Sequence, residues 1–260
     1  MKHVKTALIA EVMKLRRARI FWITVFIFMF MPVMMGLLMY ISQHPELGEK
    51  LGLLGDKAKL FTSNDWPSFF DMMLRAVGAM SLLGYGFVAT WVFGREYTDH
   101  TLKDILALPV PRSSIVLAKF LLISFWNLLL VSILFIMCLA EGYILNLPHW
   151  EAGNFPLFAW HFFGVAILSL LLTSPVAFLA GYSKGIIAPL GFLVFTMILS
   201  QLTGAIGLGL YFPWTIPSLF AVPDGMQGMN LVPVSYIILL ITGVSCYWAT
   251  NRWWKKGDHV

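Results

Sequence analysis

A polar and charged stretch between two long apolar runs carries the residues that could do chemistry in this chain. It spans residues 95–112 and reads Arg-Glu-Tyr-Thr-Asp-His-Thr-Leu-Lys-Asp-Ile-Leu-Ala-Leu-Pro-Val-Pro-Arg. Thr101 and Asp104 have the spacing of a helix-capping pair, and Pro109 would stop a helix that starts there. Apolar residues recur between them at Leu102, Ile105, Leu106 and Leu108. The stretch therefore predicts a short amphipathic helix that a soluble partner protein could grip.

Several residue patterns that carry enzymatic or metal chemistry are absent from the sequence. It contains no G-x-x-x-x-G-K-[ST] phosphate loop, no H-E-x-x-H and no C-x-x-C. The six histidines are scattered along the chain without the spacing of metal ligands. We therefore expect no catalytic residues, no metal site and no cofactor bound by this chain.

The composition is that of a membrane protein. Of 260 residues, 59% are hydrophobic and only 12% are charged, whereas soluble domains carry about 25% charged residues. The net charge of +5 does not indicate a nucleic-acid partner, because the basic residues gather at the ends of apolar runs. Cys138 and Cys246 both lie inside apolar runs, so we expect no disulfide framework.

Six apolar stretches are long enough to cross a bilayer, which takes about 20 residues each. We therefore expect an all-α polytopic membrane protein with one transmembrane domain, residues 1–260. Two prolines inside the runs, Pro175 and Pro189, predict kinks. The predicted spans are Ile20–Ile41, Met72–Phe93, Ile115–Ala140, Leu157–Tyr182, Ile186–Leu210 and Val232–Thr250.

The distribution of Lys and Arg predicts the orientation of these spans. Basic residues crowd the N-terminal tail, the stretch 95–112 and the C-terminus, whereas the loops Glu141–Pro156 and Tyr211–Leu231 have none. Cytoplasmic loops carry the excess of Lys and Arg. Both termini and the 95–112 stretch are therefore predicted to be cytoplasmic, in a multi-pass protein of the plasma membrane.

Two further segments are apolar without being spans. Residues 1–19 place Val4, Leu8, Val12 and Leu15 at helical spacing beside many basic residues. This pattern predicts an amphipathic helix in the inner interface, attracted by anionic lipid, although simple positive-inside anchoring would also fit. Residues 211–223 are aromatic and interrupted by three prolines. They predict a re-entrant or interface-hugging segment, with a plain aromatic belt as the alternative.

The cytoplasmic stretch also resembles a known family. Arg-Glu-Tyr-x-x-x-Thr-Leu-Lys from Arg95, followed by Leu-Pro-Val-x-Arg and Ile-Val-Leu-Ala-Lys, is similar to the permease subunits of type-2 ABC transporters. The six-span permeases of bacitracin-resistance, lantibiotic-immunity and sodium-export systems are the most similar. This resemblance covers the whole chain, and it implies a type-2 ABC exporter fold in which the 95–112 segment couples to an ATP-binding subunit. The residues it assigns to that contact are Glu96, Tyr97, Thr101, Leu102, Leu106, Pro109 and Arg112.

The resemblance further implies the composition and work of a complex. Two permease subunits, either two copies of this chain or one copy with a homologue, would act with two ATP-binding subunits that hold ATP and magnesium. The missing phosphate loop agrees with a separate ATPase. The permease pair would export an amphipathic or hydrophobic compound, such as a peptide antibiotic, by alternating access. The family places the pathway between subunits, walled by the second and fifth spans; the expected lining residues are Ser81, Thr90, Gln201, Thr203 and Arg75.

Two alternatives to transport remain at this stage. The chain could be a membrane scaffold or sensor whose cytoplasmic helix docks a signalling protein, and an intramembrane enzyme is disfavoured because no catalytic pair is visible. Copurification of an ABC ATP-binding subunit would separate transport from the scaffold. The sequence leaves the substrate and the choice between homodimer and heterodimer open.

Overall fold

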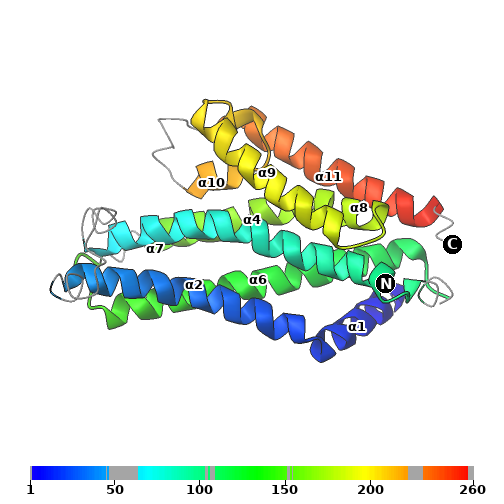
Figure 1. The fold of residues 1–260 in the computed structure, drawn as a ribbon, viewed down its shortest axis with the longest axis horizontal. Helices are drawn as coiled ribbons and strands as arrows, with labels where there is room; N and C mark the ends of the chain where they lie inside the picture. The colour runs from blue at the N-terminus through cyan, green and yellow to red at the C-terminus, as the bar shows by residue number, and fades with distance from the viewer. Residues whose placement is uncertain are drawn as a thin grey trace.

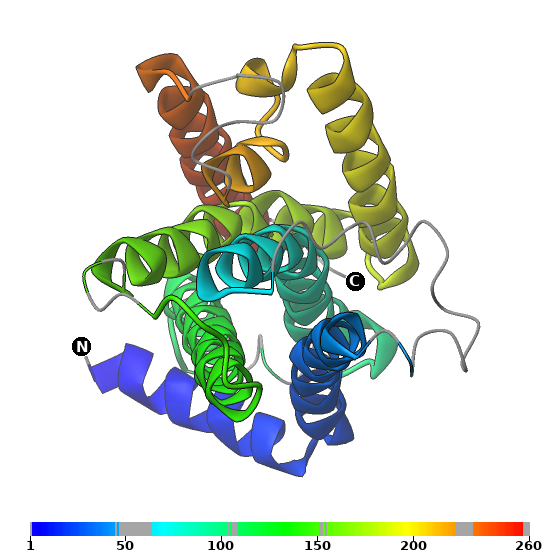
Figure 2. The same ribbon diagram turned by 90° about the vertical axis from the view of Figure 1, so that its left-hand side faces the viewer.

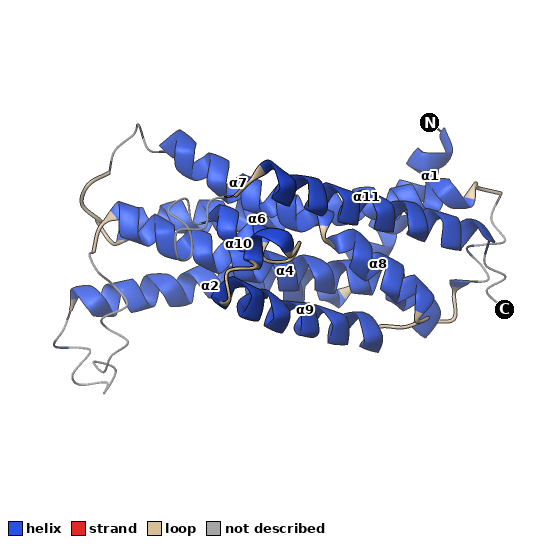
Figure 3. Ribbon diagram, turned by 90° about the horizontal axis from the view of Figure 1, so that it is seen from above, coloured by secondary structure: helices blue, strands red, loops and turns tan. Residues whose placement is uncertain are grey.

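The described part of the chain consists of helices joined by loops, without strands (Figure 3). The computed structural model describes residues 2–44, 46, 64–102, 105, 109–150, 153, 155–221 and 231–256. Within these residues, six helices are long and apolar enough to cross a membrane. The prediction of an all-α membrane protein with six spans is confirmed.

The helices follow the predicted apolar runs with some shifted boundaries. Helix α9 ends five residues before the predicted end of the fifth span, at Ala205, and α4 extends beyond its predicted span at both ends. The spans are α2 (Arg19–Gln43), α4 (Trp66–Thr98), α6 (Arg112–Ile144), α7 (Phe155–Leu171) continued by α8 (Thr173–Tyr182), α9 (Ile187–Ala205) and α11 (Pro233–Lys256); the shorter helices are α1 (Lys2–Arg17), η2 (Gly209–Tyr211) and α10 (Ile216–Ala221).

Helix α4 occupies the centre of the bundle. In the end-on view of Figure 2 the other spans surround it, and it packs against α2, α6, α7, α8, α9 and α10. The most apolar window of α4 is 61% buried, against 22% in α2 and in α11. Both chain termini lie at one end of the bundle, here named the termini end, and the opposite end is named the far end (Figure 1).

At the far end, α4 begins earlier than the apolar run suggests. Asp65 caps the helix, because its Oδ1 accepts a hydrogen bond of 3.0 Å from the backbone N–H of Ser68. Asp71 and Arg75 both lie inside the helix. Helix α4 therefore begins at Trp66, ahead of the predicted span that starts at Met72.

At the termini end, α4 continues through the charged residues that begin the predicted coupling segment. It ends in a Schellman motif: the N–H of His100 binds the carbonyl of Tyr97, and the N–H of Thr101 binds the carbonyl of Glu96. His100 has a φ of 55°, as this motif requires. Glu96 and Tyr97 are thus helical residues of α4, and the link to α6 is confined to residues 99–111.

The fourth span is broken where Pro175 predicts a kink, between α7 and α8 at Leu172. Proline cannot donate to the carbonyl four residues earlier, which here belongs to Leu171. The hydroxyl of Ser174 lies 2.7 Å from that carbonyl and 2.8 Å from the carbonyl of Gly243 in α11. The break is therefore fastened to α11, and the predicted kink is confirmed.

The other predicted kink is wrong. Pro189 lies in the first turn of α9, which begins at Ile187. Backbone N–H groups of a first turn have no partner within the helix. A proline there interrupts no hydrogen bond, and no helical turn precedes it to be bent.

The aromatic segment after α9 packs inside the protein. Ile216 and Leu219 of α10 are buried, and α10 contacts α4 and α7. Gly78 of α4 allows this approach, since a Cβ there would lie 3.4 Å from the Cα of Ser218. The packing fits the re-entrant interpretation, because irregular backbone at membrane depth must be surrounded by protein.

Helix α1 crosses the bundle axis at the termini end and packs against α6 (Figure 2). Leu8 and Leu15 face inward as predicted, whereas Val12 is exposed. Glu11 and Lys14 take part in the inward face instead. The amphipathic helix is present, but its buried face carries charge.

A test of the fold uses the contact between α11 and the break in the fourth span. A Cβ at Gly243 would lie 3.2 Å from the backbone carbonyl oxygen of Leu171, which cannot move away easily. We expect Gly243→Val to destabilise the protein by about 1–3 kcal/mol through overpacking. Gly191→Val is the matched control, since no atom lies within 4 Å of that position. Equal thermal unfolding midpoints for the two purified variants would contradict this packing.

Candidate functional site: a buried charge cluster at the termini end

Four charged side chains meet where α1, α4 and α6 converge. Lys119 of α6 and Lys14 of α1 both contact the same carboxylate oxygen of Glu96, at 2.8 and 2.9 Å from their Nζ atoms. Glu11 of α1 completes the group, 2.9 Å from Lys14 and 3.2 Å from Lys119. We name these four residues the charge cluster.

Lys119 is the most constrained member of the charge cluster. Its side chain and that of Glu96 are fully buried. The ammonium group donates to Glu96, to Glu11 and to the backbone carbonyl of Val92, the last at 3.0 Å. An ammonium group has three N–H donors, so all of them are used.

The charges of the cluster balance, two positive against two negative. A buried ion pair contributes little net stability, but removal of one partner is costly because it leaves an uncompensated charge. Burial lowers the pKa of Lys14, but the carboxylates of Glu11 and Glu96 outweigh it and raise that pKa above 10.5. The stability from this shift is fully present below pH 10.5 and is lost as pH rises through the raised value. Lys14 therefore carries its positive charge at physiological pH.

The charge cluster also holds the start of the predicted coupling segment. The hydroxyl of Thr101 donates a hydrogen bond of 2.9 Å to the second carboxylate oxygen of Glu96. Leu102 and Ile105, on the predicted apolar face, are both buried. Glu96 thus links the segment to α1 and α6 through a single carboxylate.

Other contacts at this end fasten the neighbouring helices. Arg112, the first residue of α6, donates to the backbone carbonyls of Trp254 and Lys255 in the last turn of α11, at 3.3 and 3.4 Å. Gly94 of α4 lies so close to the loop between α8 and α9 that a Cβ there would be 3.0 Å from the carbonyl oxygen of Gly185. The 95–112 region is therefore anchored on three sides.

The predicted coupling residues lie in different surroundings in the structure. It brings Glu96 and Thr101 into direct contact. Tyr97 faces α8 and α11: its hydroxyl and the Trp253 indole both lie within 4 Å of a Cβ placed at Gly181. Leu102 is buried, Pro109 is exposed, and Arg112 reaches from α6 to α11. Leu106 lies outside the described residues.

The predicted pathway residues are spread along the bundle. Ser81 and Thr90 of α4 are each 1% exposed, so the chain's own helices cover them. Arg75 is exposed on α4, and its separation of 15 residues from Thr90 corresponds to about 22 Å of helix. One small site cannot contain both.

The two pathway residues of α9 also differ. Gln201 is exposed. Thr203 is partly buried, and its hydroxyl lies 3.0 Å from that of Thr215 before α10. In this conformation Thr203 therefore fastens α9 to the re-entrant segment.

Sequence reasoning missed Glu11 and Lys119 as partners. The signals were present, because Glu11 is the only acidic residue before Glu46 and Lys119 lies within an apolar helix. An ionisable residue in a membrane helix requires a partner of opposite charge. Choosing that partner needed the fold, since Glu11 and Lys119 are 108 residues apart.

One catalytic pattern does occur in the sequence. Residues 181–185 read Gly-Tyr-Ser-Lys-Gly, which fits G-x-S-x-G. The nucleophile elbow of hydrolases places this motif between a strand and a helix. Here it begins with the last two residues of helix α8 and continues into the turn before α9, so the structural context of the elbow is not met.

Comparison with known proteins agrees with this architecture. The family described as ABC-2 family transporter protein matches residues 7–200, which include the whole charge cluster. The chain belongs to the ABC-2 transporter family. It is also 26% identical over 193 residues to the bacitracin transport permease protein BCRB of Bacillus licheniformis, covering 74% of this chain and 91% of that protein. The chain is therefore a multi-pass transporter permease, of a family that generally works with an ATP-binding subunit.

The balance of charge in this ABC-2 permease can be tested by breaking and restoring it. Lys119→Met leaves two buried carboxylates with one lysine, so we expect a loss of about 3–5 kcal/mol in the free energy of unfolding. Adding Glu96→Gln leaves Glu11 paired with Lys14 and should recover much of that loss. Thermal unfolding of the purified variants measures both effects, with Lys256→Met on the exposed end of α11 as control. Additive losses in the double variant would show that the four charges do not act together.

Proposed function

We propose that this chain is the permease subunit of an ATP-driven exporter of amphipathic or hydrophobic compounds. A separate ATP-binding subunit binds ATP and magnesium and docks on the 95–112 segment, and the termini end faces the cytoplasm. The observation that carries the proposal is the charge cluster, because it connects the docking segment to three helices.

The cluster gives a route for mechanical coupling. Movement of the docked ATPase displaces Thr101, whose hydroxyl is bound to Glu96 of α4. Glu96 is bound in turn to Lys119 of α6 and Lys14 of α1. Separating these contacts would leave buried charges without partners, which is costly, so the ends of the three helices move together.

The helices differ in their ability to transmit that movement. Helices α4 and α6 each have 33 residues, about 50 Å at 1.5 Å per residue, and neither has a proline beyond its first turn. They can act as rigid levers from the termini end to the far end. The fourth span is interrupted at Leu172, which makes it the natural place for bending.

The substrate and assembly follow from the family and its relative. The relative's name includes bacitracin, a peptide antibiotic, and we propose cargo of this amphipathic kind. Two permease subunits, identical or homologous, enclose the pathway in the plasma membrane, together with two ATP-binding subunits. The predicted lining by Ser81, Thr90, Gln201, Thr203 and Arg75 remains part of this proposal.

The coupling step can be tested with one hydroxyl group. Thr101→Val removes the hydrogen bond to Glu96 and keeps the shape of the side chain. Hydrogen bonds to charged groups contribute about 1.5–3 kcal/mol, so transport per ATP should fall about tenfold or more while the ATPase remains bound. Export and ATP hydrolysis are measured together in vesicles that contain the purified complex.

Thr98→Val is the matched control for that experiment. Its hydroxyl binds only the carbonyl of Gly94 in its own helix among the contacts described, at 3.2 Å. It should keep the transport-to-hydrolysis ratio of the unmodified protein. The proposed coupling would be contradicted if the permease copurified without any ATP-binding subunit. It would also be contradicted if the Thr101→Val variant kept the transport per ATP of the unmodified protein.

A further inference from the structure

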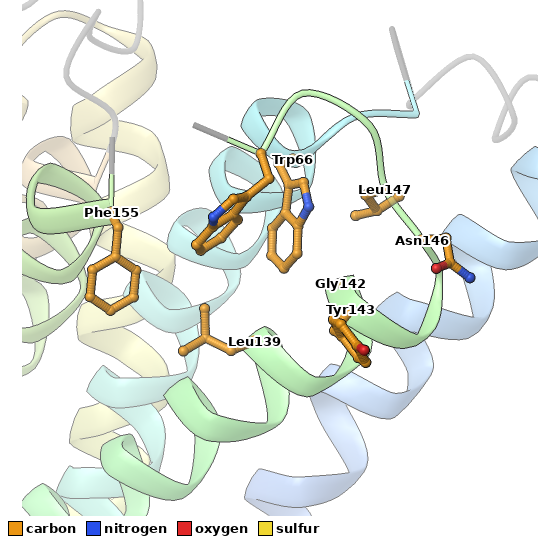
Figure 4. Close-up of a pocket in the computed structure, with 8 residues that line it drawn as sticks. Trp66, Leu139, Gly142, Tyr143, Asn146, Leu147 and Phe155 are labelled. Carbon is orange, nitrogen blue, oxygen red and sulfur yellow. The ribbon is translucent and has the colours of Figure 1, made fainter. Parts of the chain in front are cut away.

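A cavity of about 630 Å³ opens at the far end of the bundle, away from the charge cluster (Figure 4). It lies between the first turn of α4, the last turns of α6, the loop that follows, and the start of α7. Cavities of about 300–1,000 Å³ are typical of sites for small organic ligands. The lining includes Trp66, Leu139, Tyr143, Asn146, Trp150 and Phe155.

The apolar wall of this cavity is a set of packed aromatic rings. The Trp150 ring lies 4.6 Å from that of Trp66 in an edge-to-face arrangement and 6.2 Å from that of Phe155. Trp66 rests directly on α6, since a Cβ at Gly142 would lie 2.2 Å from its ring. The rings are therefore held in place by the helices behind them.

The part of the loop from Leu145 to Pro148 is also fixed by hydrogen bonds. Helix α6 ends in a second Schellman motif: the N–H of Asn146 binds the carbonyl of Tyr143, and the N–H of Leu147 binds that of Gly142. The next residue, Pro148, accepts a hydrogen bond of 3.2 Å from the backbone N–H of Trp66. The site is thus formed before any ligand arrives, which reduces the ordering cost of binding.

The described residues of the lining are amphipathic and uncharged. Figure 4 shows the Tyr143 hydroxyl and the Asn146 carboxamide on one side, with Phe155 on the opposite side. None of the eight described lining residues is charged. A carboxylate, phosphate or ammonium group would lose its hydration here without gaining an ion pair. The chemistry therefore favours an apolar or aromatic body that carries a neutral hydrogen-bonding group.

We propose that this cavity binds the apolar body of an uncharged amphipathic molecule at the membrane boundary, with Tyr143 and Asn146 hydrogen-bonded to its polar group. This site deepens the proposed function, on which it rests for the role of the bound molecule as cargo. Its location differs from the pathway expected between the second and fifth spans. A site within one subunit thus determines which class of molecule the permease binds as cargo.

The test uses a neutral alkyl amide that carries an aryl diazirine, with the permease in lipid nanodiscs. Photolabelling should be saturable and should map by mass spectrometry to peptides around residues 139–150. The unlabelled amide should compete, whereas the carboxylic acid with the same chain, at a pH where it is ionised, should not. Labelling spread evenly over the lipid-exposed helices, or equal competition by the acid, overturns the proposal.

Two variants give the site its own controls. Leu139→Trp fills the cavity and should abolish saturable labelling, whereas Leu128→Trp, on an exposed position of the same helix, should leave it unchanged. Trp150 is 46% exposed, so Trp150→Ala should fold and weaken binding about three- to tenfold through the lost ring contact. If Leu139→Trp fails to fold, unchanged binding in Trp150→Ala by itself overturns the site.

The labelling result and the transport result separate the two proposals. Labelling needs neither ATP nor the ATP-binding subunit, so its failure overturns the cavity and leaves the exporter proposal standing. Intact labelling in a complex that does not export the amide with ATP supports the cavity and overturns its role in export.

Discussion

The sharing of one carboxylate oxygen by two lysines is the interaction on which the termini end depends. Glu96 and Lys119 are both fully removed from water, and a buried charge without a partner of opposite sign is costly. Because Glu96, Lys119 and the pair Glu11 and Lys14 come from α4, α6 and α1, the full set of ion contacts forms only when these three helices meet. The need to pair these buried charges therefore determines how α1, α4 and α6 are placed at the termini end. The coupling segment is added to it through the hydroxyl of Thr101.

The bundle contains uninterrupted helices that hold the charge cluster and one interrupted span that does not. The two helices that contribute to the cluster from the membrane, α4 and α6, are long and uninterrupted. The fourth span breaks beside Pro175, and Ser174 ties the break to α11 rather than to the cluster. A push at the termini end would thus travel along α4 and α6 to the far end. The aromatic cavity lies at the far ends of the same two helices. The proposed docking site and the proposed binding site are therefore joined by α4 and α6.

The sequence predicted most of the fold because local composition determines where the membrane spans lie. Runs of about 20 apolar residues must be helical in a membrane, and a proline must free the carbonyl four residues before it. The length of α4 was missed because Arg95 to Thr98 have the polarity of a loop, although Glu96 is buried among charges from distant helices. The charge cluster and the aromatic cavity depend on contacts between segments far apart in the chain. Local patterns carry no information about which lysine meets which carboxylate.

The central claim is that α1, the coupling segment and the ends of α4 and α6 move as one body during the ATP cycle. Spin labels at Ile9, which is 59% exposed on α1, and at Pro109, exposed in the coupling segment, measure it directly in a variant without Cys138 and Cys246. Pulsed electron-spin distance measurements on the complete complex compare the nucleotide-free state with an ATP-bound state trapped by a hydrolysis-deficient ATPase. The account predicts one narrow distance distribution that is the same in both states. A shifted or second distance in the ATP-bound state would show that α1 separates from the coupling segment, and would contradict the account.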